Sequence, residues 1–348
     1  MPNLPTGIVL VAGFTYIFWS GLSLAWTPFP GESGGRYASF VTIAVLGALL
    51  THILPRRVGA SRLYILSGGV AIGWIICLGL SFAPEAEINR AVVERSLITL
   101  SLLVPPVCVW LIYRRRDLLA IILVLAALLA TIFLKSFVMT AAMLASMTAF
   151  AASLVSPDRT RYYLAIGLGM LVLFAPLIPV LLVFPAGIAF GEESAVAQTF
   201  SDWFRIIADD PFRLLTGHGF DTIGRAAEAG LIPLNAPHGL LIDTWFELGI
   251  IGAIAEACLF TAFIMLSSTM TRPSAAAMQS VIAGLFVIGV FGGNALQMPW
   301  LASVALAGLA IAALERGQYK TARPASSDIS ALKAKPSGFS IFPERFRF

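Results

Sequence analysis

The sequence predicts an all-α polytopic membrane protein with about ten transmembrane helices. Of its 348 residues, 58% are hydrophobic and only 12% are charged. A soluble domain is nearer half apolar and a quarter charged. The mean hydropathy of +0.87 points the same way. Several apolar runs also reach the roughly 18 to 20 residues with which a helix crosses a bilayer.

Ten apolar segments are read as spans. Their ranges are 7–26, 38–54, 63–82, 96–113, 117–134, 136–155, 162–184, 240–266, 275–293 and 298–314. Lys135 and Ser136 interrupt one long apolar run, so we expect a helical hairpin there rather than a single helix. Residues 1–314 therefore form a membrane domain that includes one long loop, 185–238.

The distribution of Lys and Arg predicts which side of the membrane each connection faces. With the start of the chain placed in the cytoplasm, the inner segments hold sixteen Lys and Arg and the outer segments seven. Cytoplasmic loops carry the excess of positive charge, so both termini are expected in the cytoplasm. One miscounted span would reverse this assignment. The segment 315–348 is basic and rich in Ser and Pro, which predicts a disordered cytoplasmic tail that contacts anionic lipid.

The loop 185–238 is far longer than a connection between packed helices needs. Four of its apolar residues recur at the spacing of one helix face: Phe200, Trp203, Phe204 and Ile207. This pattern predicts an amphipathic helix that lies in the bilayer interface or packs on top of the bundle. Gly217 and Gly219 in "TGHGFD" then predict a turn, because glycine adopts positive φ freely.

The chain has three histidines, and one of them stands at the start of an apolar run. His52 reads as an interfacial side chain, and His218 as a solvated residue of the glycine turn. His238 follows Pro237, a residue suited to the first turn of a helix. The positive end of the helix dipole disfavours an imidazolium there. A neutral imidazole can accept a proton, so His238 is the candidate general base.

Arginines of the outer segments are the candidate anion ligands. Arg90 and Arg95 precede the fourth span, and Arg213 and Arg225 lie in the long loop. Guanidinium grips phosphate in a bidentate manner. The alternative is a set of surface ion pairs with nearby carboxylates. Glu256, inside the eighth span, is either functional or a protonated side chain bonded to a neighbouring helix.

Sequence motifs for several other chemistries are missing. Cys77, Cys108 and Cys258 fall in apolar runs without CxxC spacing, so we expect buried reduced thiols. The sequence has no metal-ligand spacing, no phosphate-binding GxxxxGK[ST] loop and no GxSxG nucleophile elbow. Neither a metal, a cofactor nor a nucleic-acid partner is expected.

In order and spacing, the motifs resemble those of the O-antigen ligase and O-antigen polymerase family. The matching residues are Trp203, Pro211, Leu214, Gly217, Gly219, Arg225, His238, Leu241, Glu247, Leu248, Gly249 and Gly252. The segments "WTPFPGESGGR" and "NRAVVERSLITLSLLVPP" also look like that family. The resemblance extends from about Ala12 to Leu314.

The resemblance implies a GT-C-like bundle and metal-independent, inverting glycosyl transfer at the periplasmic face of the bacterial inner membrane. The family's donor is a glycan on undecaprenyl diphosphate. Its acceptor is a lipid A core sugar in the ligases and another lipid-linked repeat in the polymerases. By position, the roles implied are His238 as catalyst, Arg225, Arg90, Arg95 and Arg213 as diphosphate ligands, and Glu247 and Trp203 as supporting residues.

Two positions depart from the family pattern. Thr199 stands where the family often has arginine, and Gly239 stands where asparagine usually follows the motif histidine. The "WTP" segment and the moderate loop length favour a ligase over an O-antigen or exopolysaccharide polymerase. Two non-enzymatic alternatives remain: a transporter or flippase for a lipid-linked sugar, and a membrane scaffold.

Overall fold

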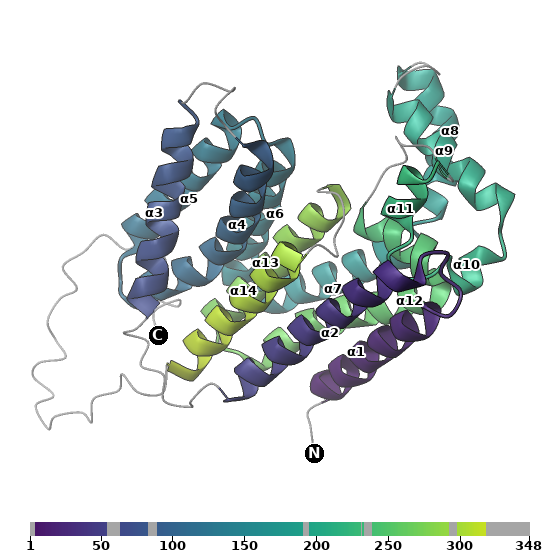
Figure 1. Cartoon of the computed structure of the whole chain (residues 1–348). Coiled ribbons are helices and arrows are strands. Elements are labelled where there is room, and N and C mark those ends of the chain that lie inside the picture. The colour runs from purple at the N-terminus through teal and green to yellow at the C-terminus, as the bar shows by residue number, and fades with distance from the viewer. Residues whose placement is uncertain are drawn as a thin grey trace, which may run out of the picture. The chain divides into compact units, whose positions relative to one another are not determined.

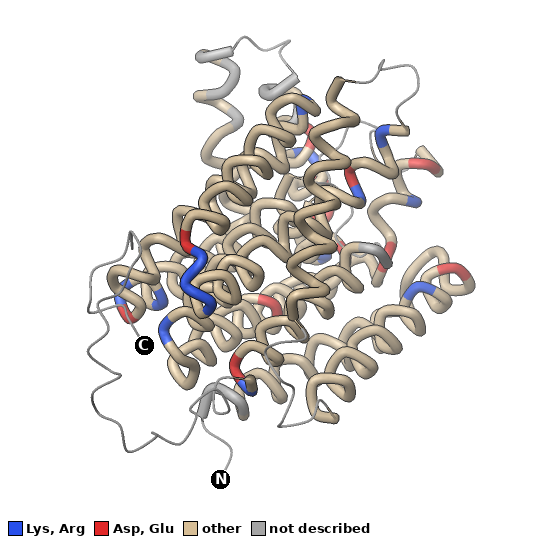
Figure 2. Tube along the Cα trace, turned by 90° about the vertical axis from the view of Figure 1, so that its left-hand side faces the viewer, with Lys and Arg blue, Asp and Glu red and all other residues tan. Residues whose placement is uncertain are grey.

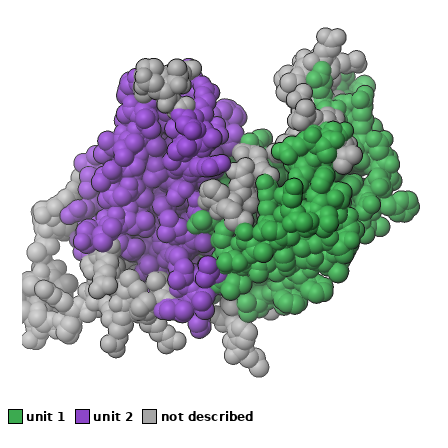
Figure 3. Space-filling view, in the orientation of Figure 1, with its two compact units in different colours: residues 1–45, 158–269, 285–302 green, residues 46–157, 270–284, 303–348 purple. Residues whose placement is uncertain are grey.

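The computed structural model describes residues 4–53, 63–82, 89–190, 195–230, 232, 239–291 and 298–317 (Figure 1). Within these ranges the chain is built from helices and has no strand, which confirms the all-α prediction. The chain divides into two compact units (Figure 3). The first unit comprises 1–45, 158–269 and 285–302, and the second comprises 46–157, 270–284 and 303–348.

The helices follow one another in the order of the expected spans, with three further helices inside the long loop. Those before the loop are α1 Leu4–Ser23, α2 Pro30–Ile53, α3 Tyr64–Leu80, α4 Arg90–Tyr113, α5 Asp117–Phe133, α6 Phe137–Val155, α7 Pro157–Leu173 and α8 Leu177–Phe190. Those that follow are α9 Ala195–Asp209, α10 Arg213–Thr216, α11 Ile223–Glu228, α12 Leu240–Leu266, α13 Arg272–Phe291 and α14 Met298–Gly317. Residues 315–317, assigned to the tail, therefore belong to α14.

Six described helices are long and apolar enough to cross a membrane: α2, α4, α6, α12, α13 and α14. Three shorter apolar helices coincide with the expected spans 7–26, 63–82 and 117–134. Figure 2 shows Lys, Arg, Asp and Glu gathered mainly at helix ends and connections, with long uncharged stretches between them. The protein is therefore a multi-pass membrane protein by the length and composition of its helices.

The expected span 162–184 is not one helix, and that prediction was wrong. The helix α7 ends at Leu173, a turn follows, and α8 begins at Leu177. Pro176 explains the interruption, because proline lacks a backbone N–H and disfavours helical backbone at the residue before it. The hairpin at Lys135 is confirmed: Lys135 has a φ of 55° between α5 and α6.

The helix α12 begins at Leu240, the first residue of the expected span 240–266, and the Gly239 N–H donates to Asp243 Oδ1 at 3.0 Å. It also breaks at Gly249, whose φ of 62° and ψ of −157° are not helical. The backbone around such a break must find hydrogen-bond partners outside the helix.

Candidate functional site

The break in α12 leaves backbone carbonyls without their usual partners four residues ahead. Three successive carbonyls before Gly249 accept hydrogen bonds from distant segments instead. The pairs are His218 N–H to Phe246 at 2.8 Å, Gly219 N–H to Glu247 at 2.9 Å, and Trp19 Nε1–H to Leu248 at 2.8 Å. The glycine turn of the long loop is thereby fastened to the broken helix.

The turn can approach the break only because it contains glycines. Gly217 and Gly219 have φ of 73° and 106°, as the "TGHGFD" motif predicts. A Cβ on Gly217 would overlap the Glu247 carbonyl, and one on Gly219 would lie 2.6 Å from Thr27 Cβ. The turn is thus held between α12 on one side and the α1–α2 connection on the other.

Glu247 anchors the segment that follows the turn. One carboxylate oxygen accepts the Asp221 N–H at 2.9 Å, and the other accepts the Ile223 N–H at 3.2 Å. The side chain is buried. Glu247 therefore supports the start of α11, and both its oxygens are already engaged by backbone.

Arg225 is held by two carboxylates. It pairs with Glu32, and its Nη2 lies 2.8 Å from Asp221 Oδ2. Asp221 in turn accepts a bond from Arg36 Nη1 at 2.7 Å. Burial raises the pKa of the Asp221 carboxyl, and the two arginines oppose that rise. A diphosphate at Arg225 would have to compete with both carboxylates.

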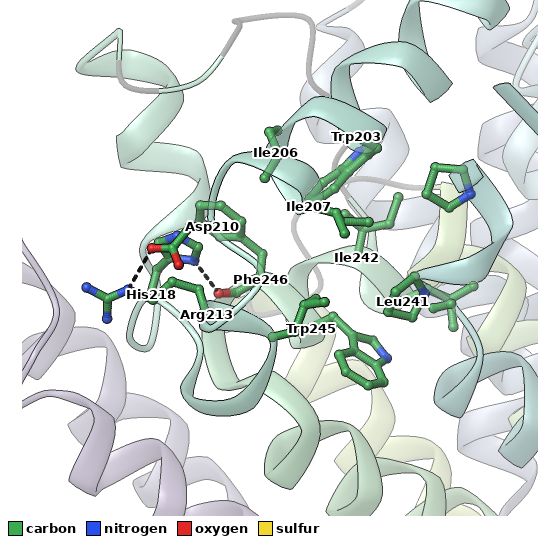
Figure 4. A pocket seen from close by; sticks show the side chains of 14 residues that line it. Trp203, Ile206, Ile207, Asp210, Arg213, His218, Leu241, Ile242, Trp245 and Phe246 are labelled. Atoms are coloured by element: carbon green, nitrogen blue, oxygen red, sulfur yellow. Dashed lines mark hydrogen bonds and ion pairs between the residues drawn. The ribbon is translucent and has the colours of Figure 1, made fainter.

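A pocket opens next to the turn, between the α7–α8 connection, α9, α10 and the first half of α12. It contains about 420 Å³ of space, part of it open solvent. Figure 4 shows Asp210, Arg213 and His218 close together at one end of it. Apolar and aromatic side chains, among them Trp203 and Leu241, line the rest.

His218 is not the solvated residue that the sequence suggested. Its ring stacks on Phe246, with centroids 4.1 Å apart and planes 11° apart. Its Nδ1 lies 3.0 Å from the Phe246 carbonyl oxygen. Because a carbonyl only accepts, this bond requires the proton on Nδ1 and leaves a lone pair on Nε2.

The surroundings also keep this imidazole uncharged at neutral pH. Burial is the largest effect and lowers the pKa of His218 below its ordinary value. The bond to the Phe246 carbonyl opposes that shift, whereas the positive charge of Arg213 adds to it. Asp210 opposes it weakly. The result is a neutral ring beside a cation.

Arg213 is more available than Arg225. Its Nε lies 3.6 Å from Asp210 Oδ2, and both side chains are about half exposed, at 41% and 51%. An exposed pair of this kind contributes little, so Arg213 can exchange Asp210 for another anion at small cost. Arg213 thus combines 41% exposure with a place on the pocket wall, and its Nη1 also donates to the Gly217 carbonyl at 3.4 Å.

The remaining sequence candidates fall in different places. Trp203 is buried and packs edge-on against Phe246, with centroids 6.2 Å apart. Arg90 and Arg95 are exposed on the first turns of α4 in the second unit, and neither lines the pocket, which is built from residues of the first unit. His238 lies outside the described residues. The site thus unites Trp203 and Arg213 with residues not singled out for it from the sequence: His218, Asp210 and Trp245.

Glu256 is buried in the second half of α12, and its Oε2 has no hydrogen-bond partner among the described residues. In the part of the chain that the structure describes, no group of three His, Cys, Asp or Glu side chains is arranged to hold a metal ion. Comparisons of the chain with protein-family models, curated proteins and solved structures find no match.

Proposed function

We propose that this protein transfers a glycan from undecaprenyl diphosphate to an acceptor sugar at the periplasmic face of the bacterial inner membrane. The acceptor that the motif order favours is a sugar of the lipid A core, which would make the protein an O-antigen ligase. An O-antigen or exopolysaccharide polymerase uses the same donor and the same chemistry, with a lipid-linked glycan as acceptor.

One observation carries this proposal: a half-exposed arginine and a neutral histidine share one end of a pocket that is otherwise apolar and aromatic. Binding sites combine mainly apolar walls with a few polar groups that orient the ligand. Arg213 supplies a bidentate partner for a phosphate. The apolar walls suit the prenyl carbons next to the diphosphate and the less polar faces of sugar rings.

The reaction fits this division of roles. The acceptor hydroxyl oxygen attacks the anomeric carbon of the donor sugar, and the bond from that carbon to the phosphate oxygen breaks. The diphosphate leaves with the electron pair, so negative charge grows on its oxygens. A fixed cation at that position lowers the barrier, because it stabilises the transition state more than the ground state. Arg213 takes this role.

The test uses purified protein in detergent with lipid-linked glycan extracted from a strain that lacks the gene, and with lipid A core as acceptor. The wild-type protein should produce a glycosylated core that is visible as slower bands on a gel. Replacement Arg213→Ala should slow transfer about 10- to 100-fold, the loss expected for one charge-assisted bond to phosphate. Arg159→Ala removes an exposed arginine of α7 outside the pocket and should transfer at the wild-type rate.

The glycans of the deletion strain separate the members of the proposed class. A ligase leaves uncapped core and intact lipid-linked polymer, whereas a polymerase leaves core capped with a single repeat. If the purified wild-type protein gives no product with either acceptor, the proposed transfer is wrong.

A flippase for the lipid-linked sugar is the second candidate, because the Gly249 break resembles the discontinuous helices that line transporter sites. Under that function the deletion strain would retain its lipid-linked glycan on the cytoplasmic leaflet. Labelling of intact spheroplasts with a membrane-impermeant lectin shows which leaflet carries the glycan.

A further inference from the structure

Glycosyl transfer of this kind needs a group that removes the proton from the attacking hydroxyl. The following inference rests on the proposed function and concerns that group. The described part of the pocket offers one neutral imidazole, His218, together with the ionised partners Asp210 and Arg213. Asp210 is about half exposed, at 51%, whereas the imidazole is half-buried and fixed against Phe246, so the imidazole is the better placed base.

The tautomer of His218 is set by its surroundings. The Phe246 carbonyl lies 3.0 Å from Nδ1, and the same oxygen accepts the His218 backbone N–H at 2.8 Å. The carbonyl therefore fixes the proton on Nδ1, and Nε2, on the opposite edge of the ring, keeps its lone pair. A base that acts in the transition state needs such a lone pair.

The ring is also held rigidly. Stacking on Phe246 fixes its plane, and Gly219 N–H bonded to the Glu247 carbonyl fixes the backbone beside it. Two residues further on, the Phe220 N–H donates to Ser23 Oγ at 3.0 Å. A catalytic group anchored on both sides in this way pays little entropy to reach its working position.

We infer that His218 is the catalytic base of this site and that its Nε2 accepts the proton of the acceptor hydroxyl. As the oxygen–carbon bond forms and the carbon–phosphate oxygen bond breaks, the proton passes to Nε2 and the ring becomes an imidazolium. Asp210 and Arg213 are the two charged groups that face the ring. The negative charge of Asp210 stabilises the imidazolium, and the positive charge of Arg213 destabilises it. The imidazolium afterwards returns its proton to water, which restores the neutral ring.

The experiment measures initial rates of transfer by the full-length protein between pH 5.5 and 8.5, with the extracted lipid-linked glycan as donor and lipid A core as acceptor. His218→Asn keeps a side-chain amide that can donate to the Phe246 carbonyl but has no base at the position of Nε2. His218→Gln is the second variant, for use if the first is unstable. His52→Ala is the control, since His52 belongs to α2 outside the pocket.

A base role predicts that His218→Asn lowers kcat about 10²- to 10⁴-fold while KM for the donor changes little. It also predicts that the wild-type rate falls at acid pH, where the ring is protonated, and that the variant lacks this acidic limb. A purely structural role predicts a nearly normal rate for His218→Asn, because the bond to Phe246 is kept.

His238→Ala separates this inference from the proposed function. If the wild-type protein transfers glycan, His218→Asn is as active as wild type and His238→Ala loses the acidic limb, then transfer stands and His218 is not the base. If the wild-type protein transfers nothing, the proposed function fails first and the inference with it. If His218→Asn loses the acidic limb and His238→Ala keeps it, the assignment of His218 as the base is supported.

Discussion

Single side chains hold the site by satisfying backbone groups, and Glu247 is the clearest case. Its two oxygens accept two backbone N–H groups of the segment between the glycine turn and α11. The family resemblance implied a supporting role for Glu247 but gave no partner. The partner lies more than twenty residues away and is defined only by the fold.

Replacing Glu247 should therefore weaken the loop. Glu247→Ala leaves two buried N–H groups without acceptors, at a cost of about 1 to 3 kcal/mol each. Glu247→Gln keeps one acceptor oxygen and should lose about half as much stability. Thermal unfolding of the purified protein, with limited proteolysis of the loop, measures the difference; equal midpoints for Glu247→Ala and wild type would show that the two bonds contribute nothing.

The titration of His218 offers a pH prediction. Its pKa in the folded protein lies below the ordinary 6.5, so the neutral ring is the form that folding favours. The stabilisation is complete above about pH 6.5 and is lost as the pH falls through the folded pKa. Nuclear magnetic resonance of histidine-labelled protein, assigned with His218→Asn, should show a midpoint below 6.5 and the Nδ1–H tautomer. A midpoint above 6.5 would contradict this.

The two loop arginines, Arg213 and Arg225, show what the sequence cannot predict about a charged side chain. Sequence position made Arg225 and Arg213 equivalent outer cations, but the fold gives Arg225 two carboxylate partners and leaves Arg213 half exposed. Glu32 and Asp221 are 189 residues apart in the sequence, so no local pattern could pair both with Arg225. The residue type predicts a positive charge, but it does not predict whether that charge is available to bind a ligand.

At the level of elements, the break in α12 organises the site. An Ala at position 249 would strain a backbone with φ of 62° and would put its Cβ 2.7 Å from the Gly217 nitrogen and the Leu215 carbonyl oxygen. Strain of this kind costs about 1 to 3 kcal/mol before any displacement of the turn. Gly249→Ala should thus lower the unfolding midpoint and impair the pocket.

Gly167→Ala is the matched control for that substitution. Gly167 lies in α7 of the same unit, and a Cβ there meets no atom within 4 Å. Alanine also has the higher helix propensity, so the midpoint should stay the same or rise slightly. A similar loss in both variants would mean that glycine at position 249 is not specially required.

The helix α9 covers the pocket with one part of its apolar face. The expected amphipathic helix is present, and of its two predicted environments the packed one applies to Trp203, which is buried, whereas Phe204 is 42% exposed. Trp203→Ala should destabilise the first unit by about 3 to 5 kcal/mol, and Phe204→Ala by far less. Chemical denaturation followed by tryptophan fluorescence measures both; equal losses would place the two side chains in similar environments.

The apolar runs located helices better than helix ends: α2 begins at Pro30, where the expected span began at 38, and α4 begins at Arg90, where the expected span began at 96. Six of the ten expected spans coincide with described helices that are long and apolar enough to cross a membrane, and three more coincide with shorter apolar helices. The prediction of the seventh span, 162–184, failed because hydropathy does not detect a proline turn. The run stays apolar although α7 ends at Leu173 and α8 begins at Leu177. The break at Gly249 gave no hydropathy signal either, because the residues on both sides of it are apolar.

For the whole molecule, contacts within each unit agree with the expected order of sides. In the first unit, Thr27 of the α1–α2 connection bonds to Thr222 of the long loop at 3.0 Å, and both connections were expected outside. In the second unit, Tyr113, Thr271 and Glu315 are linked by hydrogen bonds, and all three lie next to expected inner segments. Each set of connections therefore lies at one end of its unit.

Cysteine labelling tests the sides themselves. In a background with Cys77, Cys108 and Cys258 replaced by serine, Phe212→Cys should react with an impermeant maleimide in intact spheroplasts, because Phe212 is 78% exposed and belongs to the loop that is expected outside. Arg116→Cys, exposed between α4 and α5, should react only after permeabilisation. The reverse pattern would invert the topology, and labelling of both in intact spheroplasts would mean a miscounted span.

The contact between Thr27 and Thr222 joins positions 195 residues apart, and the neighbouring bond from Arg36 to Asp221 spans almost as far. During synthesis, Thr27 and Arg36 therefore cannot form these bonds until more than half of the chain has been translated. The bonds that join the α1–α2 hairpin to the segment after the glycine turn are thus formed late in synthesis.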